Sequence, residues 1–392
     1  MNTAGTFSLS YCGSNVVHQF FCDIPQLMAI SCSGNLMNEL VPMFISAVMD
    51  SSCFIFIVIS YVHIFSAVKK IPSTEVQMMS PEVTNLTAVT EFVLLGFPTQ
   101  GTMGFLHPLL FSLVYLCALL GNGLIVLITT LDRHLHTPMY FFLRSLSFSD
   151  LCLITTTVPK SIANSLRHSS SISFPGCVVQ VFMMVFSAGA EMTLLTVMSL
   201  DRYAAICQPL HYDVIMSRDR CVQLTAVSWL GGGLYAVMNT AGTFSLSYCG
   251  SNVVHQFFCD VPQLLAISCS GNLMNKLVPI LISVVLSTCY FIFIIISYVH
   301  IFSAVRKIPS TEGKAKVYST CLPHLLVVVL FVSTGFFAYL KPTSETPSMS
   351  DLVISMFYTM VPPTFNPVIY SLRNQAMKSA VGRLMKGRLT KM

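Results

Sequence analysis

Asp150 and Glu191 are carboxylates that stand inside long apolar stretches of this sequence. On insertion scales an Asp at the centre of a membrane helix costs about 2.5 to 3.5 kcal/mol, so each carboxylate requires an interior polar site. The triplet Asp201-Arg202-Tyr203 ends the apolar stretch that contains Glu191. Charged residues often collect where a helix leaves lipid, so the triplet alone carries little information.

The composition places these carboxylates in a membrane protein. Of the 392 residues, 54% are hydrophobic and only 9% are charged, whereas about a quarter of the residues of a soluble domain are charged. Seven apolar segments follow residue 100, and each reaches the spanning length of about 20 residues. They lie at about 109–131, 139–163, 178–200, 221–244, 277–303, 317–340 and 352–372. The predicted fold is therefore an all-α membrane protein, a seven-transmembrane helix bundle.

The basic residues predict the orientation of this bundle, because loops rich in Lys and Arg stay in the cytoplasm. One set of loops and the C-terminal tail hold most of them, namely Arg133, Arg218, Arg220, Arg306, Lys307, Lys314, Lys316, Arg373, Lys378, Arg383, Lys386, Arg388 and Lys391. The opposite loops and helix ends hold only Lys160, Arg167, Lys276 and Lys341. The formal charge of +5 thus reports topology, and no nucleic-acid partner is expected.

Four of the 14 cysteines fall on the side assigned to the exterior, where disulfides persist. They are Cys177, Cys249, Cys259 and Cys269. Four cysteines allow two bridges in three different pairings, and the spacing in sequence does not choose among them.

An internal repeat precedes the seven segments. Residues 2–75 recur at 239–312 with 61 of 74 positions identical. An architectural repeat tiles a fold, but this copy begins inside one predicted span and stops in an inner loop. A recent duplication or a misjoined gene model explains it better. We therefore predict a dispensable duplicated fragment at 1–78, with an extra N-terminal apolar segment, and a seven-span domain at 79–392 that starts at Met79.

Several motifs resemble those of olfactory receptors, a family of rhodopsin-like G-protein-coupled receptors. Residues 198–212 read MSLDRYAAICQPLHY, residues 135–140 read LHTPMY and residues 362–374 read PPTFNPVIYSLRN. The run KAKVYSTCLPH at 314–324 is close to the family's pattern but carries Val-Tyr in the region of its usual Phe. The resemblance covers about residues 80–388.

The resemblance implies roles for individual residues. Arg202 is expected to be held by Asp201 at rest and released to meet a G protein. The residues expected in coupling and activation are Asp201, Arg202, Tyr203, Asn366, Pro367 and Tyr370. The family pairs Cys177 with Cys259, which leaves Cys249 with Cys269. Asp150 and Glu191, with Asn366, resemble the sodium pocket of this receptor class, and a hydrated polar cluster without an ion remains the alternative.

The function expected from the resemblance is that of an odorant receptor, a multi-pass protein of the plasma membrane. It would bind a small, neutral volatile molecule within the bundle and activate the stimulatory olfactory heterotrimeric G protein, which raises cyclic AMP. The predicted ligand-binding residues, counted in helical turns from Arg202 and placed on the facing helices, are Met184, Val185, Ala188, Gly189, Ile282, Ser283, Leu286, Gly335, Phe336, Tyr339, Met356 and Thr359. A membrane transporter or ion channel, or a non-functional receptor variant, is the alternative.

An enzyme is not expected, because no Ser-His-Asp set, metal-ligand cluster or glycine-rich phosphate loop stands in a solvent-facing context. Asn85-Leu86-Thr87 is a sequon near the predicted outer terminus and therefore a glycosylation candidate. After the last span, Met377, Val381, Leu384 and Met385 share one helical face with basic residues nearby. This pattern predicts a short amphipathic C-terminal helix that lies on the membrane lipid of the inner leaflet.

Overall fold

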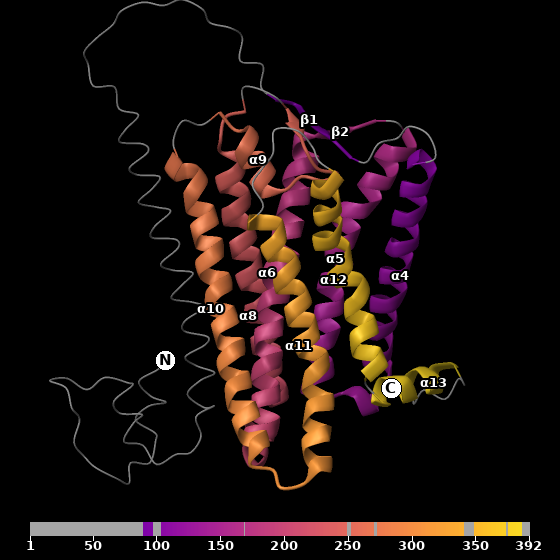
Figure 1. Cartoon of the computed structure of the whole chain (residues 1–392), viewed down its shortest axis with the longest axis vertical. Coiled ribbons are helices and arrows are strands. Elements are labelled where there is room, and N and C mark those ends of the chain that lie inside the picture. Colours follow the sequence, from indigo (N-terminus) through magenta and orange to yellow (C-terminus); the bar gives the residue numbers. More distant parts are fainter. Residues whose placement is uncertain are drawn as a thin grey trace, which may run out of the picture.

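The computed structural model describes residues 89–96, 103–167, 169–248, 252–269, 273–340, 349–373 and 375–385 (Figure 1). The duplicated fragment, the glycosylation candidate Asn85 and the cysteine Cys249 lie outside the described residues.

Among the described residues, seven long helices form a bundle, and all seven are long and apolar enough to cross a membrane. They are α4 (Met103–Leu131), α5 (Pro138–Arg167), α6 (Phe174–Cys207), α8 (Arg218–Phe244), α10 (Leu273–Arg306), α11 (Thr311–Leu340) and α12 (Met349–Arg373). The predicted seven-helix membrane bundle is confirmed. Several helices extend a turn or more beyond the predicted spans. Hydropathy marks only the part of a helix that lies in the hydrocarbon core, and the helical backbone continues beyond that boundary.

α6 is the central helix of the bundle. In the most apolar stretch of α6, 72% is buried inside the protein, whereas the corresponding share is 11% for α10 and 28% for α4. Ser173 directly precedes α6, and its hydroxyl accepts the backbone N–H of Gly176 at 3.3 Å and so caps the helix. α6 packs against α5, α8 and α10, which places its polar residues where several helices can reach them.

Gly232 determines how closely α8 approaches α6. A Cβ atom added to Gly232 would lie 2.9 Å from the backbone nitrogen of Ala190 and 3.1 Å from the carbonyl oxygen of Phe186. Missing side chains at such positions let membrane helices pack backbone to backbone. Gly232, which lies in the run Gly231-Gly232-Gly233 of α8, therefore serves helix packing.

A small sheet lies at the outer end of the bundle (Figure 1). Its central strand β1 (Glu91–Leu94) pairs antiparallel with β2 (Ser171–Ser173) and parallel with β3 (Val253–Val254). A short helix, α9 (Val261–Ile267), follows β3. These strands are too short to show in the pattern of hydropathy, and the all-α expectation did not include them.

The cytoplasmic end carries short elements between the spans and one helix after the last span. They are the 3-10 helices η1 (Arg133–Leu135) and η2 (Pro209–His211), the single turn α7 (Tyr212–Ile215) and the terminal helix α13 (Gln375–Met385). α13 lies across the end of the bundle beside α4 (Figure 1). Met377 and Ala380 are buried against the bundle, Val381 and Leu384 pack beside them, and Lys378 is exposed. The predicted amphipathic helix is therefore present.

Candidate functional site

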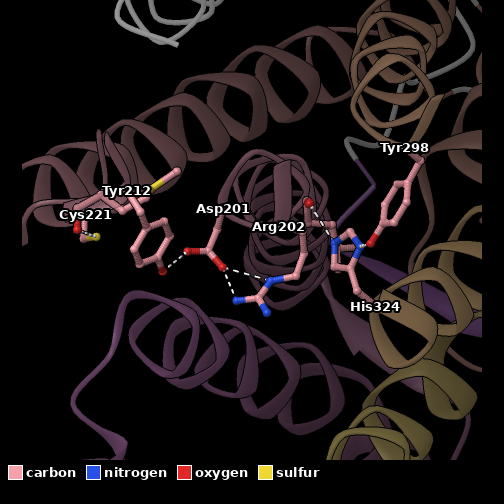
Figure 2. Close-up of polar contacts among 8 residues, drawn as sticks. Asp201, Arg202, Tyr212, Cys221, Tyr298 and His324 are labelled. Carbon is pink, nitrogen blue, oxygen red and sulfur yellow. Dashed lines mark hydrogen bonds and ion pairs between the residues drawn. The ribbon is translucent and has the colours of Figure 1, made fainter. Parts of the chain in front are cut away.

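Asp201 and Arg202 form an ion pair at the cytoplasmic end of α6 (Figure 2). The Arg202 Nε donates to Asp201 Oδ2 at 3.0 Å. The other oxygen, Asp201 Oδ1, accepts the hydroxyl of Tyr212 at 2.7 Å. Burial, reinforced by the adjacent Asp201 carboxylate, raises the pKa of Tyr212, so this hydroxyl stays protonated and acts as a donor. Both carboxylate oxygens are occupied, and Arg202 is held on its neighbour in this arrangement.

A second polar contact lies two helical turns further into the bundle and joins three helices (Figure 2). His324 Nε2 lies 2.9 Å from the carbonyl oxygen of Leu195 on α6, and His324 Nδ1 lies 2.8 Å from the hydroxyl of Tyr298 on α10. A carbonyl oxygen only accepts, so Nε2 carries the proton and Nδ1 accepts from Tyr298. This assignment makes His324 a neutral bridge between α10, α11 and α6.

Asp150, Glu191 and Asn366 meet in the middle of the bundle. Asn366 Nδ2 lies 3.1 Å from each carboxylate oxygen of Asp150 and 3.2 Å from Glu191 Oε1. Asp150 and Glu191 are completely buried, and Asn366 is 2% exposed. The structure thus brings together the three residues that the sequence analysis assigned to one pocket, from α5, α6 and α12.

This cluster has unused oxygen acceptors. Among the described residues, Glu191 Oε2 and Asn366 Oδ1 are buried and have no hydrogen-bond partner. Oxygen acceptors of this kind are the ligands that hard cations take, so Asp150, Glu191 and Asn366 fit a sodium ion. The same part of the chain contains no group of three or more His, Cys, Asp or Glu residues that could hold a metal ion.

The remaining residues that were predicted to act in activation lie along α6 and α12. Tyr203 is buried, and its ring lies 5.8 Å from that of His300 on α10. Pro367 touches α4, because a Cβ atom added to Gly121 would lie 2.9 Å from the Pro367 Cβ. Tyr370 is 1% exposed within the main apolar cluster. All three residues therefore face the bundle interior.

A disulfide between Cys177 and Cys259 fastens the outer loop to α6, in agreement with the pairing that the resemblance implies. Gln180, one turn along α6, strengthens this junction. Its side-chain oxygen accepts the backbone N–H of Cys259 at 2.8 Å, and its Nε2 donates to the carbonyl of Thr156 at 3.0 Å. Cys269 is also disulfide-bonded; its predicted partner lies outside the described residues.

Most predicted ligand-binding residues lie in the outer half of the bundle with restricted exposure. Met184 and Thr359 are completely buried, and Met184 shares an apolar cluster with Phe257 and Phe258 of the outer loop. The Ser283 hydroxyl accepts from Tyr235 at 2.6 Å and donates to the carbonyl of Pro279. Val185 is buried, whereas Ala188, Ile282, Leu286 and Met356 are half-buried.

Two of the predicted ligand positions need correction. Gly189 faces α8, because an added Cβ atom would lie 3.2 Å from the Tyr235 ring and 3.4 Å from the Gly232 Cα. Phe336 is 60% exposed, which suits a side chain facing lipid and not the wall of an enclosed site. The adjacent Gly335 has no atom within 4 Å of an added Cβ, and the side chain of Tyr339 lies outside the described part of the structure. Counting helical turns from Arg202 did not predict which way Gly189 faces on α6, and the sequence did not predict which way Phe336 faces on α11.

Tyr212, Tyr298, His324 and Gln180 were not among the predicted site residues. Tyr212 lies in the quoted run at 198–212, so its proximity to the triplet was a usable signal. His324 is a polar residue within an apolar span, which is itself a signal of function in membrane proteins. Gln180 and Tyr298 carry no such signal, because each finds its partner only after the helices pack.

Seven spanning helices, an ion-paired Asp-Arg at the inner end and a disulfide-tethered loop at the outer end together define a seven-transmembrane receptor and not an enzyme. The sequence model of the olfactory receptor family matches residues 6–97 and 111–388. The chain is 71% identical to human Olfactory receptor 14A16 over 307 residues, which cover 78% of this chain and 99% of that protein. It is 52% identical to human Olfactory receptor 14K1 over 307 residues, which cover 77% of this chain and 96% of that protein, and 51% identical to human Olfactory receptor 14A2 over 302 residues, with the same two coverages. The chain belongs to the olfactory receptor family, and it is a multi-pass protein of the plasma membrane.

Proposed function

We propose that this olfactory receptor binds a small neutral volatile molecule in the outer half of its bundle and activates the stimulatory olfactory G protein, raising cyclic AMP. The observation that carries the proposal is the Asp201–Arg202 pair, with Tyr212 on the second carboxylate oxygen. The half-buried guanidinium of Arg202 is a cation that its own neighbour holds at the cytoplasmic end of α6. Its release would create a donor for a partner that binds there.

The three-helix bridge at His324 supports a mechanism for this release. His324 links α11 to Leu195 on α6 and to Tyr298 on α10, and Leu195 lies two turns from Arg202. A ligand that favours separation of α11 from α6 would break these hydrogen bonds. The inner ends of the helices would then part, and Arg202 would be free to leave Asp201.

The surface beside this pair suits a protein partner. Leu210 in η2 is 93% exposed and Val214 in α7 is 66% exposed. Exposed apolar residues on a cytoplasmic turn are typical of interaction sites. Both residues flank Tyr212, which contacts Asp201, so a G protein docked on this turn would lie against the ion pair.

The ligand proposal rests on those predicted ligand-binding residues that face the bundle interior, none of which carries a charge. Met184, Val185, Ala188 and Met356 are apolar, and Ser283 and Thr359 offer hydroxyl groups already engaged with backbone carbonyls. Such a lining favours a molecule with apolar surface and few polar groups. It gives an ammonium or carboxylate no counter-charge.

The test is a cyclic-AMP screen in which each carbon skeleton is offered as alcohol, aldehyde, ketone, amine and carboxylic acid. We expect responses to neutral members and none to their charged counterparts at neutral pH. Cells that lack the stimulatory α subunit are the control, and the response should vanish in them. Odorant-dependent ion flux that persists in those cells would instead establish the channel or transporter alternative.

We also propose that Asp150, Glu191 and Asn366 hold a sodium ion that favours the resting receptor. The ion would supply a positive charge to two buried carboxylates, and the unused Glu191 Oε2 supports its presence. Replacing potassium with sodium at constant ionic strength should lower ligand-free cyclic AMP. Asp150→Asn and Glu191→Gln should remove this difference. A sodium-independent wild-type receptor that responds normally to odorant would leave the site as a hydrated polar cluster.

We propose that residues 1–78 are dispensable for this function. The apolar run 40–68 copies α10 but carries Asp50 in place of Ser287, which costs about 2.5 to 3.5 kcal/mol at a helix centre. If it inserted as α10 does, the following seven spans would invert against the positive-inside tendency. Chains starting at Met1 and at Met79 should show equal Asn85 glycosylation and odorant response. Signalling by the longer chain alone would contradict the proposal.

A further inference from the structure

Asp132 and Arg383 form an ion pair between elements that are 251 residues apart in sequence. Arg383 Nε on α13 donates to Asp132 Oδ2 at 3.0 Å, and Arg383 Nη2 donates to the same oxygen. Asp132 follows α4 directly and caps η1, because its Oδ1 accepts the backbone N–H of His134 at 3.0 Å. Both oxygens of this carboxylate are therefore engaged, one with the first cytoplasmic turn and one with the terminal helix.

The burial of the two partners is unequal. The Asp132 side chain is 1% exposed, whereas the Arg383 side chain is 33% exposed. Burial raises the pKa of Asp132, but the hydrogen bond from Arg383, the backbone hydrogen bond from His134 and the charge of Arg383 outweigh it and hold this pKa below its ordinary value. Removing the guanidinium while α13 stays in place would leave the carboxylate without its counter-charge, which is unfavourable. Departure of α13 from α4 would break this ion pair.

Packing places Arg383 against the bundle. Met377 is 1% exposed and Ala380 is completely buried on the same side of α13, whereas Lys378 and Ser379 are exposed. α13 packs on both α4 and α12 (Figure 1). The two basic side chains described on this helix thus differ, since Arg383 has a buried acidic partner and Lys378 faces outward.

α12 is also fixed to α4 deeper in the bundle. Asn122 Nδ2 donates to the carbonyl of Pro363 at 2.7 Å. Gly121 lies so close to Pro367 that an added Cβ atom would overlap its ring. α12 and α13 are separated by a single residue in sequence. The inner end of α12 therefore lies between two attachments to α4, one at Pro363 to Pro367 and one through Arg383.

We infer that the Asp132–Arg383 pair is a restraint that holds α13 and the inner end of α12 on α4 while Asp201 holds Arg202. Any rearrangement that moves the inner end of α12 away from α4 must also displace α13, and it must then break this ion pair and both of its hydrogen bonds. The pair thereby favours the resting arrangement. Its effect on signalling rests on the proposed G-protein function, whereas its effect on the position of α13 does not.

Three variants separate this restraint from a general effect on folding. Arg383→Gln leaves Asp132 charged and unpaired, and it should raise ligand-free cyclic AMP about threefold to tenfold per receptor at the surface. Asp132→Asn keeps an oxygen for His134 and should have a smaller effect. The double variant should resemble Asp132→Asn, because contacting partners are not additive. Lys378→Gln, on the exposed side of the same helix, is the control and should behave as wild type.

A labelling experiment measures the position of α13 without any signalling readout. Ala380→Cys places a thiol at a completely buried position, and Ser379→Cys places one at the exposed neighbour. We expect a maleimide to label Cys at 379 equally in all backgrounds, and Cys at 380 several-fold faster when Arg383→Gln is present. The same receptor with neither added cysteine provides the background.

Each outcome bears on the inference. Unchanged labelling at 380 in Arg383→Gln, or purely additive effects in the double variant, would overturn it. Faster labelling without a rise in ligand-free cyclic AMP would show that the pair positions α13 but does not restrain the resting state, which also overturns it. If wild type gives no cyclic AMP with any odorant, the proposed function fails, and the labelling result still decides whether the pair holds α13.

Discussion

The two ends of the helix bundle are held together by different kinds of contact. At the outer end, the Cys177–Cys259 disulfide, the Gln180 hydrogen bonds and a three-stranded sheet fix the loop to α6. At the inner end, α6 is joined to its surroundings by side-chain hydrogen bonds, one from Tyr212 to Asp201 and one from His324 to the carbonyl oxygen of Leu195. Covalent and backbone contacts persist, whereas side-chain pairs can exchange partners. Under the proposed mechanism, the outer end is therefore the fixed frame and the inner end is where the bundle opens.

Removing the disulfide should have the largest effect. A cross-link spanning 82 residues stabilises a fold by about 4 to 5 kcal/mol in the chain-entropy model. Cys177→Ser or Cys259→Ser should therefore abolish surface expression, measured by antibody staining of intact cells. Cys289→Ser is the control, because Cys289 is an exposed free cysteine on α10. Normal surface levels and response in either disulfide variant would mean that the outer frame does not depend on this bond.

Removing the guanidinium at the inner end should separate signalling from folding. Arg202→Ala should silence odorant-evoked cyclic AMP and leave the receptor at the surface, because the fixed frame lies at the other end of the bundle. Surface staining and cyclic AMP measured on the same cells provide the comparison. Arg144→Ala, which removes a guanidinium that lies over the Phe141 ring, serves as the control. An unchanged response in Arg202→Ala would remove that residue from coupling.

Gly232→Ala tests the packing that connects the two ends. The added methyl group would meet the backbone of α6, and overpacking of this kind costs about 1 to 3 kcal/mol. We expect a fall in the melting temperature of purified receptor. Gly123→Ala adds the same group where no atom lies within 4 Å and should not destabilise. Equal melting temperatures for the two variants would contradict close backbone packing between α6 and α8.

Asp260 should give the outer end a modest pH dependence. Burial raises the pKa of this carboxyl to about 7, from an ordinary value near 3.8. Because the folded state binds the proton more tightly than the unfolded state, this contribution is fully present below about pH 4 and is lost as pH rises through 7. The melting temperature should fall by a few degrees between pH 5 and pH 8, and Asp260→Asn should reduce that fall. An identical pH profile for wild type and Asp260→Asn would exclude this group as the cause.

The sequence predicted the parts of this receptor that depend on local composition. Span length and hydropathy gave the seven helices, because each span meets lipid independently of the others, and the distribution of basic residues predicts their orientation. The runs at 198–212 and 362–374 carried the family assignment. The motif also placed Asp201 beside Arg202, since neighbours in sequence need no tertiary structure to meet.

Tertiary structure decided which side chains far apart in sequence meet. Gly189 and Phe336 were assigned to the ligand site, yet one faces α8 and the other is largely exposed. Asp132 and Arg383 carried no signal of their pairing across 251 residues. Hydropathy reports whether a helix lies in lipid but not how it is rotated about its axis. That rotation is set by contacts with neighbouring helices, such as the approach of α8 to α6 at Gly232, and those contacts exist only once the bundle has packed.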